Sequence, residues 1–189
     1  MAGNPELRSR LQWITDQDPR VRSTHPTLAL NVAKHHSHSI RHVDPCDEGP
    51  SFNCFQFAFG LKDSTVVVDL LTTDRDQGFP LGLTFGAEFV ERLIDRELLV
   101  VDAEGDLLAY FADARPAHAG LIDEHDRVTS KWGGGHLWNH EIWEVPSSYG
   151  DCYERYSAKE SGLVEEEFRI YEKELRERLN STSAESTDP

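Results

Sequence analysis

A cysteine and a histidine about sixty residues apart are the residues best suited to chemistry. Cys54 opens an apolar helical run, Asn53-Cys54-Phe55-Gln56-Phe57-Ala58, and His118 opens an apolar strand within Pro116-Ala117-His118-Ala119-Gly120. The peptide dipoles at a helix N-terminus favour the thiolate, and a neighbouring imidazole can hold it as an ion pair. The pair predicts attack of the Cys54 thiolate on an amide or ester carbonyl, with His118 protonating the leaving group. The alternative is a buried core cysteine and an unrelated histidine.

The segments around this pair show helical or strand patterns separated by turn signals. Before Cys54 we expect a helix over 5–15, a strand over 27–32 and an exposed loop over 44–51. Cys54 to Leu61 predicts a buried helix with Asn53 as its N-cap, whose first backbone N–H groups would form an oxyanion hole. After it, Thr65-Val66-Val67-Val68 has strand character, and a turn is expected at Gly78-Phe79-Pro80.

The later segments give the clearest pattern, a run of strands that ends in a charged helix. His118 begins the second of these strands, and a hairpin turn over Asp123-Glu124-His125-Asp126 leads to the return strand. The expected elements, in chain order, are a helix over 87–96, strands over 98–102, 107–111, 118–122 and 127–132, a polar-aromatic segment over 138–146, a helix over 165–179 and a polar tail from 180.

The composition indicates which binding partners and which cellular compartment to expect. The 189 residues carry a formal charge of −15, which repels phosphate backbones and anionic lipid, so neither nucleic acid nor a membrane is expected as a partner. Neither a signal peptide nor an apolar run of membrane-spanning length is expected. The odd count of three cysteines argues against a disulfide framework and favours a reducing, cytoplasmic setting.

The order of elements resembles that of NlpC-type papain-like cysteine hydrolases over about residues 50–135: a cysteine helix, a Gly-Asp turn, a strand, a strand that starts with histidine, and a hairpin return. In those enzymes a polar side chain on the return strand orients the imidazole. Counting back from a hairpin centre between Glu124 and His125 places His118 opposite Ser130 or Lys131. Ser130 suits the orienting role, because a charged Lys131 cannot accept a hydrogen bond.

A closer resemblance runs over about residues 50–150, to an uncharacterised bacterial domain-of-unknown-function family. The matching motifs are Asn53-Cys54-Phe55-Gln56-Phe57-Ala58, His118-Ala119, Ser130-Lys131-Trp132-Gly133, His140 and Tyr149-Gly150. This chain departs from that family's pattern with Phe57 in place of tryptophan and Asn139 in place of glutamate. The resemblance implies a papain-like fold with an unassigned substrate. It makes His140 a second candidate, to orient His118, to bind substrate or to cap a loop.

Metal binding is the competing hypothesis for the histidines. His35, His36, His38 and His42 cluster in the sequence, and His136 and His140 are four residues apart, as in a helical zinc pair. The glutamate that a protease-type zinc helix carries after its first histidine is Leu137 here, so surface histidines are the favoured interpretation.

The two other cysteines are poor nucleophile candidates. Cys46 and Cys152 both lie next to acidic residues, which disfavour a thiolate. A Cys46–Cys54 disulfide is conceivable and would block the chemistry.

These observations predict an α+β papain-like (NlpC-type) fold. A cysteine helix would pack on a small antiparallel sheet, with extra helices at both termini. The expected divisions are an N-terminal extension over 1–49, the papain-like domain over 50–180 and a disordered tail over 181–189.

The predicted function is thiol-dependent hydrolysis of an amide bond, as a peptidase, amidase or deamidase, with the candidate catalytic residues Cys54, His118, Ser130 and His140. A peptide or small amide is the expected substrate and a protein partner is a further option, with no cofactor and no metal. The alternatives are a catalytically silent papain-like binding or immunity module, and a metal-binding protein that uses the histidine cluster. The substrate stays open, because one fold serves many chemistries.

Overall fold

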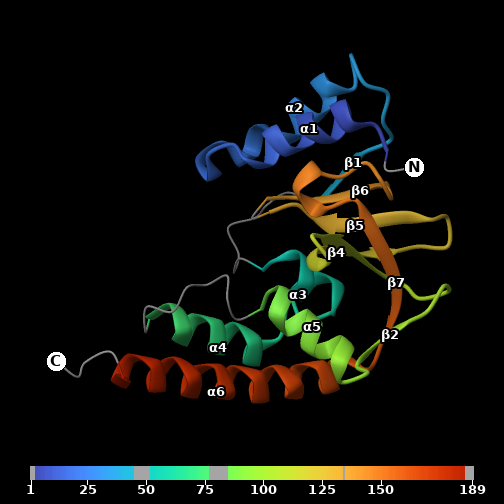
Figure 1. Cartoon of the computed structure of the whole chain (residues 1–189). Helices are drawn as coiled ribbons and strands as arrows, with labels where there is room; N and C mark the ends of the chain where they lie inside the picture. The colour runs from blue at the N-terminus through green and yellow to red at the C-terminus, as the bar shows by residue number, and fades with distance from the viewer. Residues whose placement is uncertain (1–2, 45–51, 77–84, 134, 186–189) are drawn as a thin grey trace.

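The chain folds around one antiparallel sheet with helices on both sides (Figure 1). The structure, a computed structural model, describes residues 3–44, 52–76, 85–133 and 135–185. These residues form six α-helices and seven strands, and all strand pairs are antiparallel. The predicted α+β class is confirmed. The loop expected over 44–51 is a strand residue at Asp44, and its remainder, like the turn expected over 78–80, lies outside the described residues.

The sheet is open, and its centre is built from consecutive hairpins. In spatial order the strands are β1 (Arg41–Asp44), β6 (Leu137–Glu141), β5 (Arg127–Lys131), β4 (Arg115–Ile122), β3 (Leu107–Ala112), β7 (Cys152–Ala158) and β2 (Leu99–Val101). The strands expected over 107–111, 118–122 and 127–132 are present with small shifts at their ends. The sequence patterns did not indicate β1 or β7. Because β1 pairs with β6, part of the expected N-terminal extension belongs to the sheet itself.

Two groups of helices cover the sheet (Figure 1). The first is α1 (Pro5–Thr15), a 3-10 turn η1 (Pro19–Thr24) and α2 (His25–Val32). The second is α3 (Cys54–Ala58), α4 (Thr65–Asp76), α5 (Ala87–Asp95) and α6 (Ser161–Glu185). A short 3-10 turn, η2 (Ser147–Tyr149), leads into β7.

Separate apolar clusters fill the two sides of the sheet. The larger joins α3, α5 and α6 to alternate residues of the central strands, among them Leu107, Ala109 and Ala119. On the other side, Trp132 and Trp138 pack against Leu7 and Leu11 of α1, and further core residues come from the opposite parity of the same strands. Because successive strand residues point to opposite faces, each central strand contributes to both cores.

Two predicted strands are helices, and in both cases tertiary packing overrides local preference. Residues 27–32 belong to α2, which has a proline in its first turn and buries Ala29. The valine run from Thr65 lies in α4, where the Ser64 hydroxyl accepts from the Val67 amide and Val67 is fully buried in the large core. The β-branched preference of such residues is worth less than that burial.

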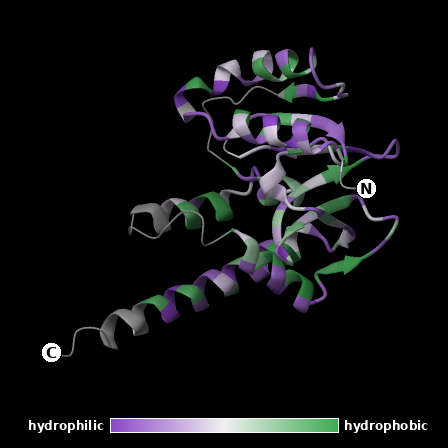
Figure 2. Cartoon of the chain, turned by 45° about the horizontal axis from the view of Figure 1, so that its top comes forward, coloured by the Kyte–Doolittle hydropathy of each residue, from purple (hydrophilic) through white to green (hydrophobic). Residues whose placement is uncertain are grey.

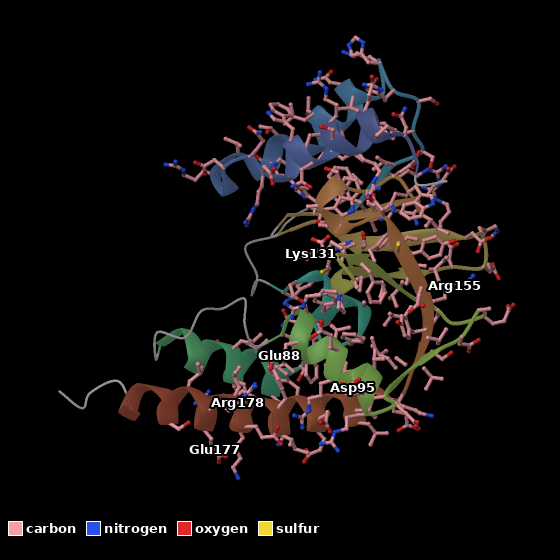
Figure 3. All side chains as sticks on the ribbon, viewed as in Figure 1. Glu88, Asp95, Lys131, Arg155, Glu177 and Arg178 are labelled. Carbon is pink, nitrogen blue, oxygen red and sulfur yellow. The ribbon has the colours of Figure 1, made fainter. Side chains whose placement is uncertain are left out.

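The C-terminal helix is longer than its periodicity predicted. It begins at Ser161 and ends at Glu185, so the first part of the expected disordered tail is helical, and residues 186–189 lie outside the described residues. Arg178 of α6 donates to Glu88 of α5 at 2.8 Å (Figure 3). Arg92 donates to Glu167 and Glu174. These ion pairs position α6 against α5.

Hydrophilic and hydrophobic residues alternate along α6, the longest helix (Figure 2). Within the described ranges, no helix combines the length and the apolar character needed to cross a membrane.

Candidate functional site

Cys54 occupies the first position of α3, and its backbone is fixed by an N-terminal capping box. The Asn53 side chain accepts from the Gln56 amide at 2.9 Å, and the Gln56 side chain accepts from the Asn53 amide at 2.8 Å. Asn53 also donates to the Phe85 carbonyl at 2.7 Å. The prediction of Asn53 as N-cap is confirmed, and Cys54 is a free thiol.

The surroundings of Cys54 favour the neutral thiol. Burial raises the pKa of Cys54 to about 11, and the backbone N–H groups of Ala119, Phe55 and Cys54 itself lower it by less. The residue keeps part of its surface exposed, while its sulfur is densely surrounded by protein. Since α3 is only five residues long, its dipole is too weak to outweigh this desolvation. The thiolate expected from the helix N-terminus is therefore not the resting form.

His118 is buried on β4 with one ring nitrogen unpartnered. Its ring stacks on Tyr149 with 3.8 Å between centroids and an angle of 10°. Its Nε2 has no hydrogen-bond partner, and the residue is 1% exposed. Burial, followed by the nearby His140, lowers the pKa of His118 well below its ordinary value. His118 is thus a neutral imidazole at physiological pH.

Cys54 and His118 approach β4 from opposite sides of the sheet. Tyr110 pairs with His118 and Ala109 with Ala119, so the side chains of His118 and Ala119 point to opposite faces. Cys54 packs in the core that holds Ala119, and its sulfur lies against the Ala119 amide. Within the described residues no hydrogen bond joins Cys54 to His118.

The two residues share a neighbour at the point where β4 and β5 separate. The β4–β5 pairing covers Gly120 to Ile122 and ends before Ala119. Tyr149 stacks on His118, and its pKa is raised by burial and, secondly, by the charge of Cys54, which places its hydroxyl within electrostatic range of the thiol. The site is therefore Cys54, His118 and Tyr149 around the point where β4 and β5 separate.

Ser130 and His140 form a closed network of their own. His140 Nδ1 lies 2.8 Å from the Glu141 carbonyl, which can only accept, so Nδ1 carries the proton. The Ser130 hydroxyl therefore donates to His140 Nε2 at 2.8 Å, and it accepts from Trp132 Nε1 at 3.2 Å. Burial lowers the pKa of His140 to about 4. Neither residue makes the hydrogen bond that would orient His118.

The predicted pairing of His118 with Ser130 or Lys131 is wrong. Ser130 pairs with Gly120, not with His118. The hairpin carries an extra loop residue, Asp126, with φ of 56°, which moves the centre of the hairpin from the position assumed in counting. Lys131, the other residue expected opposite His118, points to the other face, and its Nζ lies 4.0 Å from the Phe52 ring centroid, near α3 (Figure 3).

Tyr149 was missed as a site residue, although Tyr149-Gly150 is one of the motifs of the family resemblance. Its hydroxyl accepts from the Gly133 amide at 3.0 Å. The buried Arg8 of α1 holds the segment around it by donating to the carbonyls of Val145 and Gly150 and to the carboxylate of Asp151. The guanidinium also lies 5.5 Å from the Trp143 ring centroid. No local pattern connects Arg8 to residues so far along the chain, so the sequence held no signal for this clamp.

The histidines do not form the arrangements that metal binding would need. The favoured interpretation of surface histidines is wrong for His136 and His140, which are buried, and the two do not form a helical zinc pair, because His136 precedes β6 and His140 lies in it. His42 Nε2 lies 3.2 Å from His136 Nδ1, while His36 and His38 lie on the segment after α2, where His38 Nε2 bonds the Ala29 carbonyl. In the described part of the chain, no group of three or more His, Cys, Asp or Glu residues could hold a metal ion.

The remaining cysteines lie apart from this site. Cys152 is a free, exposed thiol at the start of β7. Cys46 lies outside the described residues.

Comparisons of the chain with protein-family models, with curated proteins and with solved structures found no match in any of the three. The chemistry of the site is therefore argued from its geometry.

Proposed function

We propose that this protein is a thiol-dependent hydrolase of amide bonds on a papain-like fold of the NlpC type, with Cys54 as nucleophile and His118 as base. One observation carries the proposal: the buried His118 keeps an unpartnered Nε2 next to the residue whose amide meets the Cys54 sulfur. Buried polar atoms are otherwise almost always hydrogen-bonded, and exceptions often mark catalytic groups. A peptide or a small amide is the proposed substrate.

The protonation states shape the proposed mechanism. Thiol and imidazole are both neutral at rest, so the imidazole acts as a general base instead of half of a preformed ion pair. As the sulfur attacks the carbonyl, its proton passes to His118 Nε2, which then protonates the leaving amine. Water hydrolyses the resulting thioester, with His118 again as base. Since catalytic hydrogen bonds often tighten only with substrate bound, the reaction requires the Cys54 sulfur and the His118 ring to approach each other beside Tyr149, where β4 and β5 separate.

A second candidate, a catalytically silent papain-like binding module, is favoured by a different observation. Ser130 and His140 satisfy each other, and neither holds His118 in place. A Cys–His pair without an orienting residue, with both members neutral, is the expected remnant of lost catalysis.

Acylation by p-nitrophenyl acetate separates the two candidates. The hydrolase predicts release of one equivalent of nitrophenol per protein and an acetyl group on Cys54, located by peptide mass mapping. His118→Ala should slow this acylation by roughly 10²- to 10⁴-fold, the usual contribution of a general base. Cys152→Ser is the matched control and should acylate as fast as the parent. If folded Cys54 reacts no faster than the same thiol in urea, the hydrolase proposal fails and the silent module is supported.

A further inference from the structure

The outer side of the α1–α2 layer carries an apolar groove with a basic rim. The groove, about 390 Å³, lies between α1 and the end of α2, and Trp13, Leu28 and Val32 form its apolar walls. Trp13 is 51% exposed, a large fraction for so large an apolar side chain. A second hollow of about 610 Å³ adjoins it and shares Trp13 and Arg10. An exposed tryptophan between two hollows is typical of a binding hot spot.

The rim of this groove is positive on a protein that is strongly negative. Arg10, Lys34, His35 and His36 line it, and within the described residues neither Arg10 nor Lys34 makes an ion pair. Glu6 lines the adjoining hollow, and its carboxylate lies 3.9 Å from His36 Nδ1. Residues 1–43 hold six Arg or Lys and three Asp or Glu, whereas the rest of the chain holds 13 and 31. The basic groups are therefore concentrated on the layer that carries the groove.

We propose that this groove binds an acidic segment of another protein that carries a large apolar side chain. The apolar side chain would fill the space beside Trp13, and its flanking carboxylates would pair with Arg10 and Lys34. The net negative charge of the chain repels an acidic partner only weakly, because physiological salt screens the interaction between exposed charges more than about 8 Å apart. The basic residues at the rim of the groove therefore determine how it interacts with the acidic segment. A groove whose walls are mainly aliphatic fits such a segment better than the stacked bases of a nucleic acid.

The site is separate from the proposed catalytic residues. It is lined by residues of α1, α2 and the segment after α2, in the helix group on one side of the sheet, whereas Cys54 begins α3, in the group on the other side (Figure 1). Loss of binding in the groove therefore need not change acylation of Cys54, so the two proposals fail independently.

Selection from a random peptide library on the immobilised full chain tests the proposal. Peptides that also bind the immobilised Trp13→Ala variant would then be removed from the selected pool. We expect enriched peptides with net negative charge and at least one Leu, Ile, Phe or Trp, and fluorescence anisotropy should give affinities at least tenfold weaker for Arg10→Glu and Lys34→Glu. Lys173→Glu, an exposed site on α6, is the matched control and should bind like the parent. Circular dichroism melts check that each variant is folded.

Three outcomes would overturn the proposal. They are enrichment of neutral or basic peptides, enrichment of no peptide, and equal binding to the parent and the groove variants. A labelled single-stranded oligonucleotide runs in parallel. If it binds more tightly than the peptides and is lost in the same variants, the groove is a nucleic-acid site instead.

Discussion

The pair of His118 with Cys54 and the pair of His140 with Ser130 differ in how their polar atoms are satisfied. In the second pair, every ring nitrogen and hydroxyl has a partner within hydrogen-bond distance. In the first, a buried nitrogen has none and the thiol meets only backbone amides. A complete network fixes a core and has no capacity left for a substrate, whereas an incomplete one keeps a lone pair available at a cost in stability.

This difference changes the interpretation of His140. The sequence offered three roles for it, and its hydrogen bonds favour a structural one, close to the loop-capping role, because its Nδ1 proton holds the Glu141 carbonyl at the end of β6. The contrast can be tested by removing each histidine in turn.

The largest expected effect separates the two histidines by activity. His118→Ala should lower the rate of Cys54 acylation by roughly 10²- to 10⁴-fold, and His140→Gln should keep it within roughly tenfold, because only His118 takes the proton. The measurement is the burst of nitrophenol at pH 7. Equal losses in the two variants would show that the closed network is part of the catalytic machinery.

The next effect tests the hydrogen bonds by which Arg8 holds the segment around Tyr149, the residue that stacks on His118. Arg8→Met removes the donors to Val145, Gly150 and Asp151 and leaves buried carbonyls unsatisfied, which should cost about 3 kcal/mol of the free energy of unfolding. For a chain of this size the melting temperature should fall by ~10 °C. Arg20→Met, at an exposed site, is the control. A change of less than ~2 °C in Arg8→Met would contradict the clamp.

Breaking the closed network should have a smaller effect on stability. Ser130→Ala leaves both His140 Nε2 and Trp132 Nε1 without their partner in a fully buried site, and the expected loss is about 1–3 kcal/mol. Urea denaturation measures it, and Ser148→Ala, at an exposed site where the side chain makes no described hydrogen bond, is the control. A double-mutant cycle with His140→Gln should give a coupling energy above ~0.5 kcal/mol, and additive effects would contradict the network.

The last effect is a gradual loss of stability in mild acid. The unfolded chain takes up protons near pH 6.5, the ordinary histidine pKa, whereas buried His140 has a pKa of about 4 and that of His118 is also lowered. Stability should therefore be full above pH 6.5 and fall as the pH drops towards 4, by about 1.4 kcal/mol per pH unit for each such histidine. His140→Gln should flatten this slope in chemical denaturation series, and an unchanged slope would show that His140 does not cause it.

The sequence alone determined the local features of the site. Asn53 and Gln56 specify the start of α3 through contacts three residues apart, and the alternating strands and turn residues specify the central hairpins. These features depend on neighbours in the chain, so periodicity and turn chemistry were sufficient to predict them.

Tertiary structure decided how those features combine. One extra loop residue in the β4–β5 hairpin placed Ser130 opposite Gly120, two residues from His118, so the two side chains share a face of the sheet but are not paired. Burial, not the helix dipole, set the protonation of Cys54, and Arg8 brought Tyr149 onto His118 from more than a hundred residues away. Register, desolvation and long-range contacts depend on the whole packed molecule, which no local pattern encodes.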